Sequence, residues 1–239
     1  MNTRKLWIAF IVVMVGCFSV LGIFGYEIYL QKPPIPERIV SQSGEQLFSA
    51  QEIKDGQSVW QSIGGQEVGT VWGHGSYVAP DWSADWIHRE AVYMLNAMAE
   101  STDSMPFDKL TPERQAYFKA LLQKDVRTNR YDDATQTLVI SDLRAKAIKS
   151  NAEYYKNLFT NGKEQAKERI AYAIPENTVK NNESMHKMNA FFFWTAWACV
   201  TERPGKDITY TSNWPGDELV GNHPTGKHLF WTMFSIVML

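Results

Sequence analysis

The longest hydrophobic segment of the chain lies near its N-terminus. No charged residue occurs from residue 6 to residue 26, and Arg4 and Lys5 come directly before this run. At a rise of about 1.5 Å per residue, a helix of this length covers a hydrocarbon core of about 30 Å. Positive charge before such a helix favours a cytoplasmic N-terminus. The pattern therefore predicts a cytoplasmic segment over residues 1–5 and a transmembrane helix over residues 6–30.

A cleaved signal peptide is the other interpretation of this segment. The apolar run is longer than the roughly 7–15 residues that are usual for signal peptides, and no A-x-A cleavage pattern follows it. Instead, Lys32 is followed by Pro33, Pro34 and Pro36, and proline fixes φ and blocks continuation of a helix. These features favour a retained anchor, followed by a stiff and extended segment.

The C-terminal end of the sequence is also apolar. Residues 229–239 contain no charged residue, glycine or proline. As a helix they cover about 16 Å, roughly half of a bilayer. A strongly apolar tail is rarely left exposed on a soluble protein. We therefore expect residues 229–239 to begin a second transmembrane helix of a longer chain. The alternative is a tail that packs on the surface of the preceding domain.

Between these ends, the sequence predicts one mostly helical soluble domain with minor β structure, over residues 31–228. Capping residues and helical spacing mark the helices, and a polar turn before Thr137–Ile140 marks a short β segment. The predicted helices are one opened by a capping box at Ser49 and Glu52, one from an N-cap at Ser83 to Ser101, one starting at Thr111–Pro112, one from a cap at Ser141 to Phe159, and Asn182–Val200.

The spacing of apolar residues also predicts which helix faces are buried. The residues expected to face the core are Ile53, Gly56 and Trp60 in the first helix, Trp86, Val92, Tyr93 and Ala97 in the second, and Tyr117, Leu121 and Leu122 in the third.

The composition excludes several classes of function. Lys plus Arg number 24 and Asp plus Glu number 26, so the formal net charge is −2 and there is no basic footprint for nucleic acid. Two cysteines exclude a disulfide scaffold and a four-cysteine zinc site. Because Cys17 lies in the expected membrane helix and Cys199 in the soluble domain, we expect both to be unpaired. No G-x-S-x-G, H-E-x-x-H or P-loop motif occurs.

Two pairs of titratable residues remain as candidates for chemistry. Asp81 and Asp85 are spaced for acid–base work, but carboxylates at a helix start more often stabilise the helix dipole. His74 and His88 flank a segment rich in glycine and tryptophan, and each is more often a hydrogen-bonded structural residue than a metal ligand. We therefore assign no catalytic residue to this chain.

The segment from Gly56 to Glu90 is the most distinctive part of the sequence. Glycine lets a backbone approach another body closely, and tryptophan supplies a large buried area. Its sequence is GQSVWQSIGGQEVGTVWGHGSYVAPDWSADWIHRE. It closely resembles the N-terminal region of bacterial quinol-dependent nitric oxide reductases, and so do Val139–Asp142, Phe191–Trp194 and Thr209–Pro215. The resemblance covers the whole length, including both apolar ends.

This resemblance implies an architecture and an activity. In that family, one polypeptide joins a membrane anchor, an extracytoplasmic cytochrome c-like helical domain without haem c, and a many-helix core. The core resembles the haem–copper oxidases and holds haem b, haem b3 and a non-haem iron. The implied reaction converts two NO and a quinol to N2O, water and quinone. The implied location is the bacterial inner membrane, with the soluble domain on the periplasmic side.

A second resemblance is to the small cytochrome c subunit of c-type nitric oxide reductases. Gly56 and Trp60 match the start of its motif, and Gly73–Pro80 matches the end without a gap. Where its Cys-x-x-Cys-His motif falls, this chain has Gly65-Gln66-Glu67-Val68-Gly69. Because the thioether bonds of haem c need cysteine, the resemblance implies a domain that binds no covalent haem.

The same comparison implies one metal site. In the c-type enzymes, backbone carbonyls of the matching turn bind calcium, which prefers hard oxygen ligands. The matching residues here are Gly75 and Tyr77, with Ser76 between them, while His74 replaces the glutamate of the motif. Two interpretations remain: a calcium site at Gly75 and Tyr77, or a tight structural turn without metal.

The resemblance thus implies a non-catalytic cap over the haem-containing core of the same polypeptide. Its expected partners are membrane lipid, that core, and quinol for the full-length enzyme. A membrane-anchored binding or structural module without a reductase core is the alternative from another class. An anchored c-type electron carrier is a third option, but it lacks its Cys-x-x-Cys-His motif.

Overall fold

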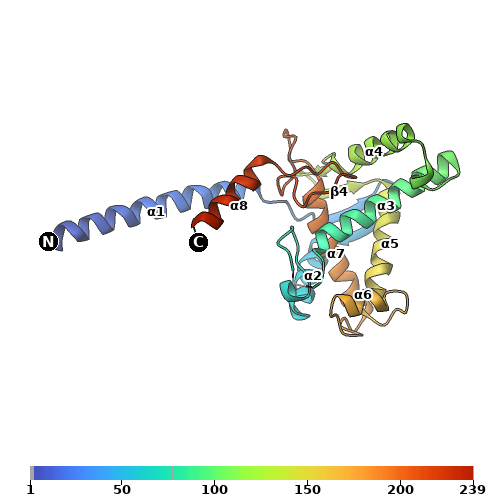
Figure 1. Cartoon of the computed structure of the whole chain (residues 1–239), viewed down its shortest axis with the longest axis horizontal. Coiled ribbons are helices and arrows are strands. Elements are labelled where there is room, and N and C mark those ends of the chain that lie inside the picture. The colour runs from blue at the N-terminus through green and yellow to red at the C-terminus, as the bar shows by residue number, and fades with distance from the viewer. Residues whose placement is uncertain (1–2, 77, 239) are drawn as a thin grey trace. The chain divides into compact units, whose positions relative to one another are not determined.

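The computed structural model describes residues 3–76 and 78–238 and divides into two compact units, Met1–Pro34 and Ile35–Leu239 (Figure 1). The first unit consists mainly of helix α1, Thr3–Gln31, which has no buried residue. Among the described residues, α1 is the one helix long and apolar enough to cross a membrane. Its 29 residues extend for about 44 Å, more than the thickness of a hydrocarbon core. The predicted N-terminal apolar helix is therefore present.

A small sheet opens the second unit. Its strands are β1 Arg38–Ser41, β2 Gln46–Ser49, β3 Tyr131–Asp132 and β4 Thr137–Ile140, in the order β2-β1-β4-β3. β1 pairs with β2 in antiparallel fashion and with β4 in parallel. β4 confirms the predicted β segment, whereas β1 and β2 were not predicted, because four residues are too few to establish an alternating pattern.

Helices make up most of the second unit, so the predicted fold class, mostly helical with minor β structure, is confirmed. Their described bounds are α2 Ala50–Ser62, α3 Trp82–Asp103, α4 Pro112–Arg127, α5 Asp142–Phe159, α6 Ala166–Ala171, α7 Asn182–Val200 and α8 Gly226–Met238, with short 3-10 turns η1 Gly65–Val68 and η2 Phe107–Lys109.

Helix α7 forms the centre of the core. Every residue from Met188 to Val200 is buried, as expected for a helix that is apolar on all sides. It packs against α2, α3 and α5. Helix α2 approaches α7 closely at Gly56, where a Cβ atom would lie 1.9 Å from the carbonyl oxygen of Lys187. Because glycine has no Cβ, the two helices meet there in backbone contact.

Most of the predicted helix starts are confirmed by their capping bonds. In the capping box of α2, Ser49 Oγ accepts the Glu52 N–H, and the Glu52 carboxylate accepts the Ser49 N–H at 2.8 Å. Pro112 occupies the first turn of α4, and the Ser141 side chain caps α5. Helix α7 has the predicted bounds.

The predicted start of α3 at Ser83 is wrong by two residues. The helix begins at Trp82, and its N-cap is Asp81, whose carboxylate accepts the Ala84 N–H at 3.0 Å. An aspartate both caps the first turn and stabilises the helix dipole. Ser83 is buried, and its hydroxyl instead accepts the Trp72 N–H at 3.0 Å.

The buried faces of α3 and α4 are also only partly as predicted. On α3, the buried side faces α5 and α7, so it runs through Trp82, Trp86 and Met94. On α4, Phe118 and Val126 join Leu122 in the core. The expected core residues that are confirmed as buried are Ile53, Gly56, Trp60, Trp86 and Leu122. Those that lie exposed or half-buried instead are Val92, Tyr93, Ala97, Tyr117 and Leu121.

The C-terminal helix α8 presents apolar side chains to the outside. Its exposed large residues are Phe230, Trp231, Met233, Phe234, Ile236 and Val237. The alternative of a tail packed on the domain surface is therefore wrong for these side chains. With 13 residues, α8 is shorter than a full membrane span. A second transmembrane helix starting here stays a prediction.

Candidate functional site

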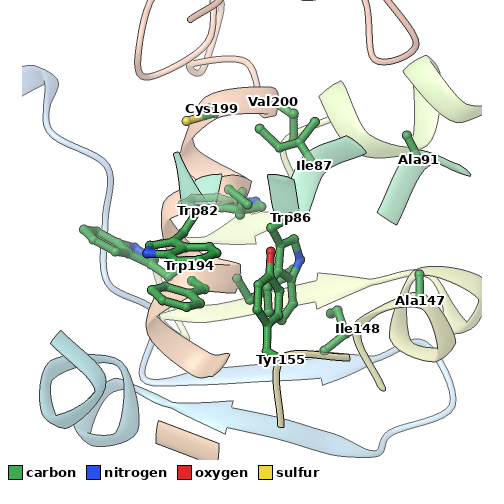
Figure 2. Packing of buried hydrophobic residues seen from close by; sticks show 14 of the residues in the cluster. Trp82, Trp86, Ile87, Ala91, Ala147, Ile148, Tyr155, Trp194, Cys199 and Val200 are labelled. Carbon is green, nitrogen blue, oxygen red and sulfur yellow. The ribbon is translucent and has the colours of Figure 1, made fainter. Parts of the chain in front are cut away.

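An aromatic cluster fills the interior behind the glycine-rich loop, residues 64–80. Trp82 and Trp86 from α3 lie among side chains of α5 and α7 (Figure 2). Trp86 stacks on Tyr155 with ring centroids 5.3 Å apart and an angle of 7°, and Trp82 stacks on Phe192 at 5.7 Å and 22°. All four side chains are fully buried. These stacked side chains therefore fill the interior between α3, α5 and α7 behind the loop.

Gly69 stands where the resemblance places the haem-ligating histidine. A Cβ atom at Gly69 would lie 2.2 Å from Nε1 of Trp82 and within 2.7 Å of two further atoms of that ring. The backbone φ of Gly69 is +129°, an angle that residues other than glycine rarely adopt. Its carbonyl accepts the Trp60 Nε1–H at 3.1 Å. A histidine side chain does not fit at this position, and the residues present do not accommodate haem c.

Asp81 organises the loop from the first turn of α3. Its carboxylate accepts three hydrogen bonds: from Thr70 Oγ1 at 2.7 Å, from the Gly73 N–H at 2.7 Å and from the Ala84 N–H at 3.0 Å. Hydrogen bonds to a charged acceptor are roughly twice as strong as neutral ones. Asp81 thus fixes the loop and caps the helix, which is the structural role that its position predicts.

Asp85 is bound in a different network. It accepts the Tyr155 O–H at 2.7 Å and the Arg89 Nε–H at 2.8 Å. Burial raises the pKa of Tyr155 well above its usual value, and the neighbouring Asp85 carboxylate adds to this shift. Tyr155 therefore keeps its proton and remains a donor at neutral pH. In this network too, the aspartate acts as a structural acceptor.

Two tryptophans hold the outer part of the loop. Trp72 Nε1–H donates to the Thr195 carbonyl at 3.3 Å, and its ring lies 5.7 Å from that of Trp194. Trp214 Nε1–H donates to the Gly73 carbonyl at 3.0 Å. A Cβ atom at Gly73 would lie 1.8 Å from that nitrogen, so the contact requires glycine. The loop is therefore bound to α7 and to the segment that follows α7.

The predicted calcium site lies at the tip of this loop. Gly75 is exposed with φ +75°, whereas Tyr77 lies outside the described residues. Ser76 Oγ is buried and has no hydrogen-bond partner among the described residues. The acid nearest in sequence, Asp81, is already committed to three donors. The described residues thus offer only neutral oxygens and do not by themselves compose a calcium site. Calcium at Gly75 and Tyr77 remains a prediction.

The histidine and cysteine candidates do not converge on a metal. His74 is exposed, and His88 Nδ1 lies 3.1 Å from a carboxylate oxygen of Asp217. Within the described residues, no group of three or more His, Cys, Asp or Glu side chains could hold a metal ion. Both cysteines are free, and burial raises the pKa of the Cys199 thiol. Cys199 is therefore a neutral core residue.

Residues 36–216 match the family model for the cytochrome c-like domain of the NorB subunit of nitric oxide reductase. The chain belongs to this family. The expected N-terminal region of the NorB subunit is therefore confirmed. No curated protein matches the chain.

Within this NorB cytochrome c-like domain, one buried ion pair was missed by sequence reasoning. Arg144 of α5 donates from Nε to Glu90 of α3 at 2.8 Å, and both side chains are at most 3% exposed. Burial raises the pKa of Glu90, while the charge of Arg144 opposes this shift. The pair joins α3 to α5 beside the aromatic cluster. Only the tertiary fold brings together two residues that are 54 positions apart.

Proposed function

We propose that this chain is the membrane-anchored, haemless cap of a quinol-dependent nitric oxide reductase and that it carries no catalytic centre of its own. The observation that carries the proposal is the contact between Gly69 and Trp82. It puts an indole ring where a haem-ligating side chain would point. Family membership supports the reductase activity of the full-length protein, and α1 supports membrane attachment.

A domain without haem c limits which molecule can donate electrons to the enzyme. A haem c at the surface of such a domain accepts electrons from a soluble cytochrome, whereas a haemless domain has no such entry point. Quinol dissolved in the bilayer then delivers electrons directly to the membrane core. That core supplies haem b, haem b3 and non-haem iron as the redox centres.

The role of the present residues is to pack and to exclude water. The Asp81 network holds the loop rigid, and the stacked rings of α3, α5 and α7 leave a dry interior. A dry cover over a haem site helps to control its potential and its reactive intermediates. Arg4 and Lys5, at the start of α1 and before its apolar stretch, support a cytoplasmic N-terminus and a cap on the periplasmic side of the bacterial inner membrane.

The absence of a catalytic centre is tested with the full chain in detergent. We expect no NO consumption at an NO electrode after addition of haem and ferrous iron, with a complete nitric oxide reductase as the positive control. Measurable turnover by the chain alone would contradict the proposal.

The haemless interior is tested by restoring the attachment motif. The variant G65C/V68C/G69H is expressed with a c-type haem maturation system beside a small cytochrome c as control. We expect no absorbance band of a histidine-ligated haem in the variant, because Trp82 blocks the histidine. A haem with histidine ligation in this variant would show that the interior has room and would overturn the argument.

A further inference from the structure

A cleft of about 340 Å³ lies on the second unit between α2, the glycine-rich loop and α7. This is within the size range of small-molecule sites. Its apolar wall is formed mainly by Trp60, Val71, Trp72, Phe191 and Trp194. The indole N–H groups of Trp60 and Trp72 donate to backbone carbonyls. These two residues therefore offer apolar ring faces to the cleft rather than hydrogen bonds.

The rim of the cleft is polar, and its charge has one sign. The polar side chains on it include Lys54, His74 and three glutamines, and none of the lining residues is a carboxylate. Lys54 is exposed and forms no ion pair within the part of the chain that the structure describes. The acids beside it on α2 face other partners: Glu52 lies 3.2 Å from His186, and Asp55 lies 3.2 Å from Lys187. The cleft therefore combines an aromatic wall with an unopposed cation.

One residue that lines the cleft is close in sequence to the apolar helix α1. Ile35 lines the cleft and follows Gln31, the last residue of α1, by four positions. An extended chain covers at most about 14 Å over four residues. Tryptophan rings and lysine side chains are also the groups that favour the headgroup region of a bilayer.

We propose that this cleft binds an anionic phospholipid of the leaflet from which the domain emerges. Its phosphate lies at Lys54 and His74, and the part of the lipid next to the glycerol packs on Trp72 and Trp194. The inference rests on the membrane attachment in the proposed function. It goes beyond that function by assigning a lipid site to the soluble domain.

The site is tested by amine footprinting of the full chain. The chain is reconstituted into vesicles of phosphatidylcholine alone, or of phosphatidylcholine with phosphatidylglycerol, and is acetylated with acetic anhydride before mass spectrometry. We expect acetylation of Lys54 to be about fivefold slower in vesicles with phosphatidylglycerol. This factor corresponds to the attraction between one lysine and an anionic membrane surface. Lys167, exposed on α6, is the internal control and should react equally in both vesicles. If acetylation slows equally at both lysines, the effect is a general one of the charged membrane surface, and the proposed lipid site is refuted.

Variants give an independent readout. Phosphatidylglycerol with brominated acyl chains should quench the tryptophan fluorescence of the wild type and of K167Q to the same extent. It should quench the tryptophan fluorescence of K54Q and H74Q less. Because both changed rim residues are exposed, these variants are expected to keep the fold, which circular dichroism checks. Equal quenching in all four proteins would overturn the proposal.

Two further experiments distinguish a lipid from a soluble phosphate ester, and the lipid site from the membrane attachment. Glycerol phosphate added to phosphatidylcholine vesicles should leave Lys54 reactive, and protection by it would identify a soluble phosphate ester instead of a lipid. Release of the chain from vesicles by alkaline extraction would refute the membrane attachment itself. A chain that stays attached without protection of Lys54 refutes only the lipid site.

Discussion

Gly56 offers the most direct test of the core, because its replacement by alanine sets two effects against each other. In the interior of an ordinary helix, glycine to alanine gains about 1 kcal/mol. Here, the added Cβ would lie 1.9 Å from the Lys187 carbonyl oxygen and 2.8 Å from the Cβ of Phe191. The nearest contact is with backbone, so no side-chain rotation relieves it. Helix α2 must move away from α7 by about 1.5 Å to restore an ordinary contact.

Such a movement loosens the packing of Ile53 and Trp60 against α7. Overpacking of a core typically costs about 1–3 kcal/mol, and the rigid backbone contact places this site at the upper end. After the gain in helix propensity, we expect Gly56→Ala to lower the free energy of unfolding by about 1–2 kcal/mol. For a unit of this size, that corresponds to a decrease in Tm of about 3–6 °C. Gly56→Val should lower the Tm further.

The assay is thermal unfolding of the full chain in detergent, followed by near-ultraviolet circular dichroism. This signal reports mainly the buried aromatic side chains of the second unit. Ser58→Ala is the matched control, because Ser58 is exposed on the same helix and its hydroxyl donates only weakly within that helix, to the Lys54 carbonyl at 3.4 Å. The change therefore gains helix propensity without a steric clash. If Gly56→Ala raises the Tm as Ser58→Ala does, α2 and α7 do not touch at Gly56, and the packing described above is wrong.

The loop, the C-terminal segment and the buried tyrosine each give a further prediction. Asp81→Ala removes a helix cap and leaves two loop donors without their acceptor, so we expect a loss of about 2–3 kcal/mol in denaturant unfolding. Arg127→Ala removes bonds to Glu202 and to the Gly221 carbonyl, and we expect faster proteolysis after residue 200 with little change in the aromatic circular dichroism. The raised pKa of Tyr155 means that the unfolded state loses this proton first, near pH 10. The contribution of Tyr155 to the free energy of unfolding is therefore complete below that pH and falls above it by up to about 1.4 kcal/mol per pH unit. Tyr155→Phe should reduce this dependence of the free energy of unfolding on pH. A Tyr155→Phe slope equal to that of the wild type would contradict the assignment.

Local signals predict much of this fold because they act within a few residues. The capping box at Ser49 and the cap at Ser141 are complete within three residues of each helix start, so the sequence is sufficient. The continuous apolar pattern of α7 likewise identifies a buried helix without knowledge of its neighbours. Strand β1 escapes prediction because one of its pairing partners, β4, lies almost 100 residues away, and β2 is a four-residue strand that pairs with β1.

The errors on α3 show where local reasoning stops. Val92, Tyr93 and Ala97 fit an inward stripe by spacing alone, but α5 and α7 pack on the side of Trp82 and Trp86. The phase of an amphipathic helix is set by its neighbours when apolar residues occur on more than one side. In the same way, the sequence shows that the cysteines of the haem-attachment motif are missing, whereas the Trp82 ring beside Gly69 is visible only in the fold.

These two features of the haemless domain are physically linked. A scaffold shaped around a flat apolar cofactor would contain a void without that cofactor, and voids cost about 24 cal/mol per Å³. The buried rings of Trp82, Trp86, Tyr155 and Phe192 fill the interior with stacked side chains instead. The aromatic run in α7, a weak indicator by itself, thereby gains a physical reason. In the proposed haemless role, this packing holds the fold, and we expect the stability of the domain not to depend on the supply of haem.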